Sequence, residues 1–182
     1  IFNESDLIKP ALGQSIWLVN NDTFSDNMLQ IPTIESVIIS KEYPNKITIE
    51  LNEYDKIMTI TDLRGSVPKK STLYKNMIEI ESDDIFLIPS LTITNGPVPP
   101  GFNGEMVSLI MTLKSYNLDV NSFNFTYNGD SFIGEYRSTL IDFGNPLDLG
   151  SKSSAIGSLI ENSECQGEIR FISKEDLIAN CS

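Results

Sequence analysis

The sequence contains no histidine, only two cysteines and a single tryptophan among its 182 residues. Without histidine, the chain cannot build a Ser-His-Asp or Cys-His catalytic arrangement or a histidine-ligated zinc site. An all-thiolate zinc site needs four cysteines and is excluded as well. The chain could then catalyse only reactions that use carboxylate side chains, or it catalyses none. We therefore expect a protein that is not an enzyme and that uses no metal or cofactor.

Basic side chains are also scarce. Lys and Arg total 13 against 25 for Asp and Glu, which gives a net charge of −12. Nucleic-acid binding depends on clustered basic side chains, so nucleic acid is excluded as a main partner. No stretch approaches the ~20 apolar residues that span a bilayer. The chain begins at Ile1 rather than methionine. We expect a piece of a longer protein, preceded by an anchor helix or a cleaved signal.

Hydrophobic residues make up 40% of the chain and charged residues 21%, which is typical of a globular protein. The first part has an α+β pattern. Helical spacing predicts short helices at residues 5–12 and 23–30. Alternating apolar residues predict strands at 34–41 and 47–54, joined by a turn that contains Tyr43-Pro44. We expect Trp17 to lie in the core of this unit, and the alternative is an exposed contact with a partner.

The second part, from residue 56, is richer in strands. The apolar pattern predicts an amphipathic helix at 103–117 and a weaker helix at 151–162. Asn128-Gly129 predicts a hairpin turn. Strands are predicted at 57–61, 77–81, 91–94, 120–127, 132–136, 138–143 and 168–172. Beyond them, residues 177–179 form either another strand or a helical turn opened by a capping box at 173–176.

The motifs of the first part resemble a known domain. Pro32 precedes an apolar strand that ends in Lys41, Tyr43-Pro44 forms the turn, and Glu53 ends the second strand. Upstream, Gly13 is followed by the apolar run Ile16-Trp17-Leu18-Val19. This order is similar to the POTRA domain of the FtsQ/DivIB family of bacterial division proteins. Ile88-Pro89-Ser90-Leu91 and the late strand at 168–172 resemble the β domain of that family.

The resemblance implies an α+β fold with two domains. Residues 1–55 would form a POTRA-like domain, with two short helices packed on a small sheet. Residues 56–182 would form a mostly antiparallel β domain with two helices. It also implies a non-enzymatic scaffold of the divisome on the extracytoplasmic side of the bacterial membrane, with a single-pass anchor upstream of residue 1. The alternative is a secreted or membrane-anchored POTRA-like adaptor of another assembly or transport system.

Partners follow from the same resemblance. They are other divisome proteins at the septum, namely FtsB/DivIC-like and FtsL-like coiled-coil proteins, and membrane contact would come only through the missing anchor. In that family a partner adds a strand to the C-terminal edge of the β domain. That edge would be residues 168–172, or 177–179 if this segment pairs outermost. The predicted partner-binding residues are Glu168, Ile169, Arg170, Phe171, Ile172, Leu177, Ile178 and Ala179.

The two cysteines and a set of carboxylates are further candidate functional residues. Cys165 and Cys181 flank the last predicted strand, so a turn between them could bring them together in a disulfide, although two free thiols remain the alternative. The carboxylates either form a solvated acidic face or supply an acid–base or calcium site. We expect the solvated face. These carboxylates are Glu79, Glu81, Asp83, Asp84, Asp142 and Asp148.

Overall fold

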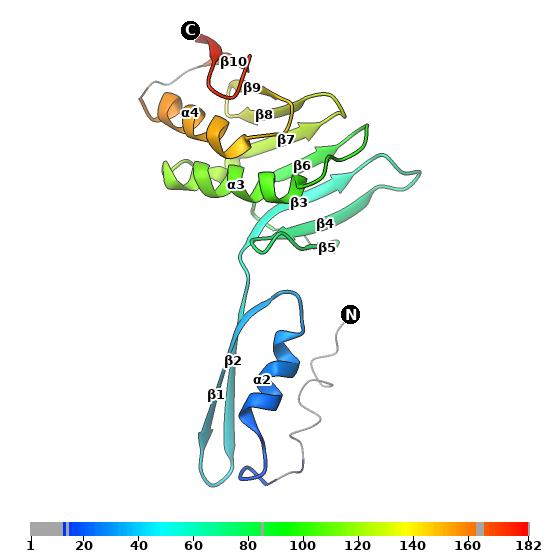
Figure 1. Ribbon diagram of the computed structural model, residues 1–182, viewed down its shortest axis with the longest axis vertical. Coiled ribbons are helices and arrows are strands. Elements are labelled where there is room, and N and C mark those ends of the chain that lie inside the picture. The colour runs from blue at the N-terminus through cyan, green and yellow to red at the C-terminus, as the bar shows by residue number, and fades with distance from the viewer. Residues whose placement is uncertain (1–12, 14, 85, 163–165, 182) are drawn as a thin grey trace. The chain divides into compact units, whose positions relative to one another are not determined.

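The computed structural model describes residues 13, 15–84, 86–162 and 166–181. The chain divides into two compact units, Ile1–Asp55 and Lys56–Ser182 (Figure 1). Both combine helix and sheet, so the protein has the α+β fold that the sequence predicts. The helix predicted at residues 5–12 lies outside the described residues.

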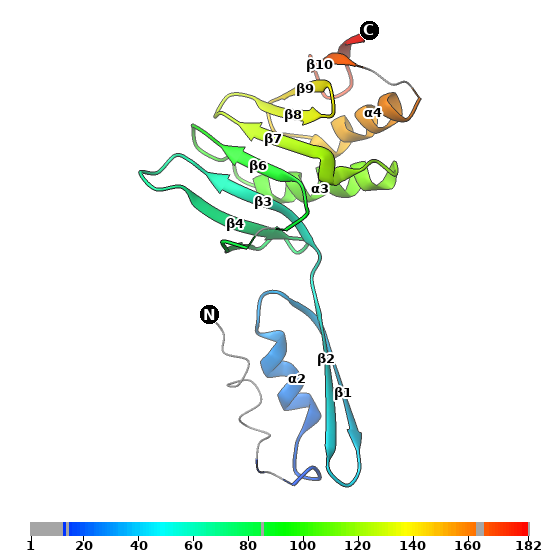
Figure 2. The ribbon, with the colours of Figure 1, turned by 180° about the vertical axis from the view of Figure 1, so that it is seen from behind.

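In the first unit, one helix packs on a hairpin. Helix α2 (Asn21–Leu29) begins at Asn20, whose side chain accepts hydrogen bonds from the backbone N–H groups of Asp22 and Thr23. Strands β1 (Ile34–Glu42) and β2 (Lys46–Glu53) pair in antiparallel register. Helix α2 lies along this hairpin in both views (Figure 2) and buries Phe24 and Met28. The hairpin and second helix predicted from sequence are therefore present.

Trp17 differs from expectation. Its side chain is 70% exposed, while its neighbours Ile16 and Val19 are buried. The prediction of a core tryptophan was wrong, because these two smaller residues occupy the interior positions of the segment. The Trp17 ring instead stacks on Tyr43, with ring centroids 4.0 Å apart.

The described part of the second unit holds one sheet of nine strands in the order β11-β10-β9-β8-β7-β6-β3-β4-β5. The strands are β3 (Lys56–Asp62), β4 (Lys69–Tyr74), β5 (Glu79–Glu81), β6 (Ser90–Ile93), β7 (Phe123–Tyr127), β8 (Phe132–Tyr136), β9 (Thr139–Gly144), β10 (Gly167–Phe171) and β11 (Leu177–Cys181). A short 3-10 helix, η2 (Val120–Ser122), leads into β7. Most neighbouring strands are antiparallel, as predicted. The pairs β3–β6, β6–β7 and β9–β10 are parallel.

Two helices connect parallel neighbours. Helix α3 (Phe102–Ser115) links β6 to β7, and α4 (Leu149–Asn162) links β9 to β10. Such connections require a crossover, because the chain must return to the same end of the sheet. Both helices lie on one face of the sheet (Figures 1 and 2). The opposite face therefore carries the polar residues of the alternating strands, such as Asn124 and Thr126 of β7.

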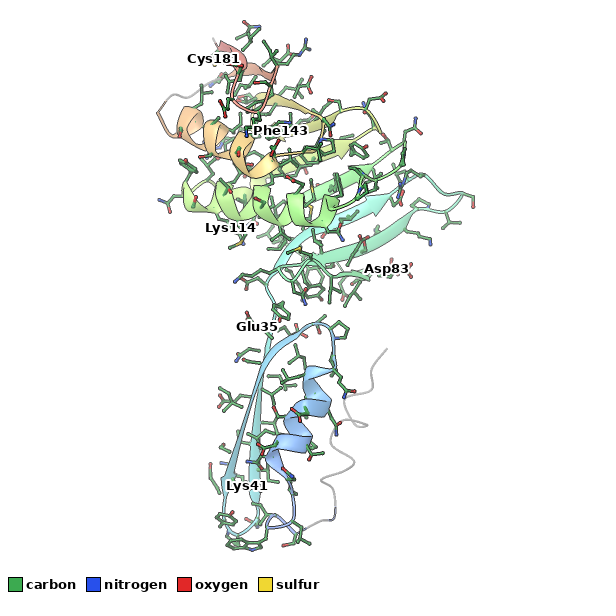
Figure 3. The ribbon with its side chains drawn as sticks, in the orientation of Figure 1. Glu35, Lys41, Asp83, Lys114, Phe143 and Cys181 are labelled. Carbon is green, nitrogen blue, oxygen red and sulfur yellow. The ribbon has the colours of Figure 1, made fainter. Side chains whose placement is uncertain are left out.

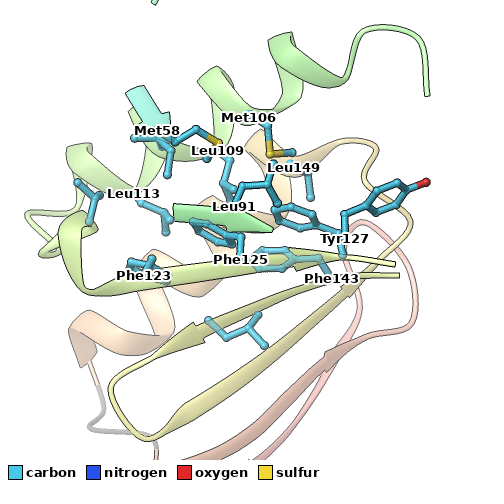
Figure 4. Close-up of a cluster of buried hydrophobic side chains, with 14 of the residues drawn as sticks. Met58, Leu91, Met106, Leu109, Leu113, Phe123, Phe125, Tyr127, Phe143 and Leu149 are labelled. Carbon is cyan, nitrogen blue, oxygen red and sulfur yellow. The ribbon is translucent and has the colours of Figure 1, made fainter. Parts of the chain in front are cut away.

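The core lies between the sheet and these helices (Figure 4). Phe123 and Phe125 of β7 point toward α3, where Met106 and Leu109 are fully buried. Aromatic contacts continue across the sheet to the last strands. Centroid distances are 5.3 Å for Phe125–Phe132, 5.6 Å for Phe132–Phe143 and 5.7 Å for Phe143–Phe171. This shared core fixes the strands that carry the C-terminal edge.

Candidate functional site: the C-terminal edge of the sheet

The edge of the sheet is formed by β11, and β10 lies inside it. β10 pairs with β9 on one side and with β11 on the other. Ile169 and Phe171 point into the core and are buried. Of the two alternatives predicted for the edge, residues 177–179 therefore lie in the outermost strand and residues 168–172 do not. Partner binding at this edge stays a prediction. Because both sides of the β10 backbone are paired, an added strand has no free hydrogen-bonding groups there.

The turn between β10 and β11 shows why the sequence of residues 173–179 fits both a strand and a helical turn. Ser173 Oγ accepts hydrogen bonds from the backbone N–H groups of Glu175 and Asp176 and donates one to Asp176 Oδ2. The bond from Asp176 N to Ser173 Oγ is one half of a capping box, yet here it lies in a hairpin turn, because Asp176 O accepts from Ile172 N. Ile172 follows β10 and is 68% exposed. The segment at 177–179 is therefore a strand, and it pairs outermost.

The hydrogen-bonding pattern shows which backbone groups of β11 face outward. The bond from Ile172 N to Asp176 O makes these two residues a hydrogen-bonded pair. Bonded and non-bonded pairs alternate along an antiparallel ladder. Hence Ile178 and Asn180 bond to β10, while the N–H and C=O groups of Leu177 and Ala179 point away from it. Within the described chain, no strand pairs with this outer side of β11.

The side chains of β11 have two different environments. Leu177 and Ala179 are partly buried and pack against the core. Ile178 is 52% exposed on the opposite face, across from Arg170 of β10. Arg170 extends toward β9, and its Nε lies 3.4 Å from Asp142 Oδ2. The edge thus combines free backbone groups with one exposed apolar side chain.

The C-terminal end of β11 is held covalently, because Cys181 is disulfide-bonded. Figure 3 shows Cys181 at the end of this strand. Cys165, the proposed partner, lies outside the described residues. A covalent link at this position limits fraying of the outermost strand, which is the part of a sheet that opens most easily.

The opposite edge of the sheet is acidic. The short strand β5 carries Glu79 and Glu81, and Asp83 and Asp84 follow; all four residues are exposed. Ser71 Oγ donates to Glu79 Oε1 at 2.5 Å. Charge on a short edge strand discourages pairing with another strand. This edge is therefore a poor template, in contrast to β11.

The remaining predicted carboxylates have separate surroundings. Asp142 Oδ1 accepts hydrogen bonds from Ser131 Oγ and Gly144 N. Asp148 has a positive φ of 56° in the turn before α4. The part of the chain that the structure describes contains no group of three or more acidic or thiol side chains placed to hold a metal ion.

A polar pair that the sequence analysis missed lies at the end of β3. Arg64 Nε and one of its terminal nitrogens donate to the two oxygens of Asp62, at 2.8 and 2.6 Å. These hydrogen bonds lower the pKa of the Asp62 carboxyl to about 2 and raise the pKa of Arg64. Both residues line a cavity of about 370 Å³ beside Phe102. Arg64 also donates to Gly96 O, so the pair ties two loops together.

Lys152 was also missed. It is 6% exposed, and its Nζ donates to the carbonyl oxygens of Phe143 and Asn145 at 2.7 and 2.8 Å. Burial lowers the pKa of this amine. A lysine within an amphipathic helical pattern is expected on the surface, so the sequence did not predict that Lys152 is buried. It fastens the end of β9 to α4.

Comparison with known families adds one finding. Residues 5–54 match the model of the FtsQ-type POTRA domain. This segment corresponds to the first unit, where the sequence resemblance was strongest. No curated protein matches the chain. A POTRA domain of this type indicates a role in protein–protein interactions of cell division and is found in the extracytoplasmic part of membrane proteins. None of the helices in the described residues is both long and apolar enough to cross a membrane.

Proposed function

We propose that this chain is the extracytoplasmic part of an FtsQ/DivIB-like division protein that acts as a non-enzymatic scaffold of the divisome. The match of residues 5–54 to the FtsQ-type POTRA domain is the observation that carries this proposal. The fold of the second unit supports it, because a mixed sheet with two helices on one face and an open last strand is suited to binding another chain.

Partner recruitment takes place by strand addition to β11. The outward N–H and C=O groups of Leu177 and Ala179 give affinity through backbone hydrogen bonds, which any sequence can supply. Selectivity comes from the side chains of the added strand. Those on the helix side lie beside partly buried Leu177 and Ala179, so small or apolar residues fit there.

On the other face, the added strand meets Ile178. An apolar side chain at that position covers the exposed part of Ile178 and removes apolar surface from water. The partner segment therefore has apolar residues on both faces near its centre. The extracytoplasmic segments of FtsB/DivIC-like and FtsL-like coiled-coil proteins are the partners of this scaffold.

The variant Ala179→Pro tests strand addition directly. Proline removes the N–H of residue 179, which points outward, and leaves the hydrogen bonds to β10 intact. Ala179→Val is the matched control, because valine has a similar volume and keeps the N–H. We expect the proline variant to bind an FtsB/DivIC-like segment about 5- to 150-fold more weakly than the valine variant, since one lost hydrogen bond with an unpaired partner costs about 1–3 kcal/mol.

Both variants must keep the thermal unfolding midpoint and circular dichroism of the unmodified chain for the comparison to count. A second proline variant, Leu177→Pro, removes the other outward donor and serves if Ala179→Pro unfolds. Equal binding by the proline and valine variants, with fold retained, contradicts recruitment through β11.

A further inference from the structure

The edge strand β11 lacks the charged side chains that usually protect an exposed edge. Its residues are Leu177, Ile178, Ala179, Asn180 and Cys181. Lysine or carboxylate groups on an edge strand oppose pairing with another strand, and β5 at the other end of the sheet carries two glutamates. Because β11 carries no such group, like charges on the strand do not oppose pairing with an identical strand.

The sequence of β11 is complementary to itself in one antiparallel register. The backbone groups of Leu177 and Ala179 point outward, so an added strand forms its hydrogen-bonded pairs with these two residues. When the added strand is β11 of a second copy, Leu177 of each copy pairs with Ala179 of the other. Each such pair exchanges two hydrogen bonds. On the side of the core, a large side chain then lies beside a small one.

Ile178 lies at the centre of this register. It stands between the two hydrogen-bonded pairs, so Ile178 of one copy faces Ile178 of the other in a non-hydrogen-bonded pair, where side chains approach most closely. In the single chain this side chain is 52% exposed, across from Arg170 of β10. The pairing removes apolar surface of both copies from water. A twofold interface requires such a patch, because the same surface must complement itself.

The neighbouring registers match less well. A shift by two residues in one direction places Ile178 opposite Asp176, and a shift in the other direction places it opposite Asn180. In the central register Asp176 faces Asn180 instead, so a carboxylate lies beside an amide. The Arg170 side chains of the two copies are separated by three strand spacings, about 14 Å. Charges at that separation are largely screened at physiological salt.

We infer that β11 pairs with β11 of a second copy about a twofold axis that passes between the two Ile178 side chains. The two sheets become one continuous sheet, with the helices of both copies on the same face. Because the contact is a single pair of short strands, the dimer is weak and accumulates at about 100 μM. A second copy and a divisome segment use the same backbone groups and exclude each other, but the dimer requires no divisome partner.

Sedimentation equilibrium of the complete 182-residue chain, with no partner present, measures this pairing. We expect dimers to accumulate at about 100 μM. The variants Ile178→Glu and Ile178→Lys each place two like charges at the twofold axis and remove the apolar contact. Each variant alone should self-associate at least about tenfold more weakly. An equal mixture of the two variants should associate more strongly than either alone, because opposite charges then meet at the axis.

The matched control is Val67→Glu, which replaces an aliphatic residue that is 70% exposed in the loop between β3 and β4. It adds the same charge away from β11 and should dimerise like the unmodified chain. An unmodified chain that stays monomeric at about 1 mM contradicts the inference. Dimerisation of Ile178→Glu at the unmodified strength also contradicts it, as does a mixture that associates no better than its components.

Amide hydrogen exchange of the unmodified chain provides a measurement that needs no variant. The amides of Leu177 and Ala179 should gain protection as the protein concentration rises, and exchange that is independent of concentration overturns the inference. This readout decides if Ile178→Glu or Ile178→Lys changes the circular dichroism of the chain. Because no divisome segment is present, failure of the dimer leaves recruitment through β11 to be tested separately.

Discussion

Gly157 on α4 lies directly against the ring of Tyr116, which ends α3. A Cβ atom at position 157 would come within 2.4 Å of Tyr116 Cδ2. The ring has little freedom to move away, because Tyr116 Oη forms a 2.7 Å hydrogen bond with Ser154 Oγ. This contact sets how closely the two helices approach on the sheet.

Replacing Gly157 with alanine should therefore destabilise the second unit, although alanine favours helix more than glycine does. The overpacking costs about 1–3 kcal/mol, which exceeds the gain in helix propensity. Urea unfolding of Gly157→Ala measures the change in free energy. Ser151→Ala, at an exposed position of the same helix, is the control and should stay within about 0.5 kcal/mol of the unmodified protein.

The pair Asp62–Arg64 gives a prediction for pH. The pKa of Asp62 falls from 3.8 to about 2 in the folded protein, mainly through hydrogen bonds from Arg64. The lowered pKa of Asp62 stabilises the fold fully above about pH 3.8, and this contribution is lost as the pH falls below 3.8 and through the folded pKa of about 2. Asp62→Asn should lower stability by about 1 kcal/mol at neutral pH. The difference between variant and parent should shrink as the pH falls from 3.8 and vanish below pH 2, as measured by thermal unfolding across that range. A constant difference would argue against the ion pair.

Lys152→Met should be more damaging. Methionine fills similar space but leaves the carbonyl oxygens of Phe143 and Asn145 without their buried donor. Each unsatisfied buried group costs about 1–3 kcal/mol. Denaturant unfolding provides the measurement, with exposed Lys174→Met as the control. If both variants unfold at the same denaturant concentration, the two hydrogen bonds of Lys152 contribute nothing.

The cysteines give a prediction about the edge strand. A Cys165–Cys181 bond closes a loop of about 15 residues and contributes about 3 kcal/mol. The double variant Cys165→Ser, Cys181→Ser should lose that stability and exchange the amides of β11 faster. Mass spectrometry with and without reductant identifies the bonded pair. An unchanged unfolding midpoint after complete reduction would contradict a stabilising role.

Much of the fold follows from local sequence signals. Alternation of apolar residues located β7, β8 and β9, and the Asn128-Gly129 turn joins β7 to β8, with Gly129 at a φ of 96°. Strand β4 was missed. Its first residues, Lys69 and Lys70, are exposed, and its buried residues include Ser71 and Thr72, so polar side chains concealed the pattern.

Features of the candidate site that depend on long-range packing could not be predicted from local sequence patterns. The hydrogen bond from Asp176 N to Ser173 Oγ can form at the start of a helix and in a tight hairpin, so these two residue types alone could not decide between the two. The choice depends on pairing with β10, which is a long-range feature of the sheet. Likewise, Trp17 has a hydrophobic ring that favours a core position, and its exposure depends on Ile16 and Val19 filling the interior.

The central claim is that β11 accepts a strand from a divisome partner. Amide hydrogen exchange tests it most directly, with and without an FtsB/DivIC-like extracytoplasmic segment at concentrations well above a micromolar dissociation constant. The account predicts new protection at Leu177 and Ala179, whose N–H groups point outward, and little change at Ile178, whose N–H is bonded to β10. The absence of new protection at Leu177 and Ala179 would contradict the account.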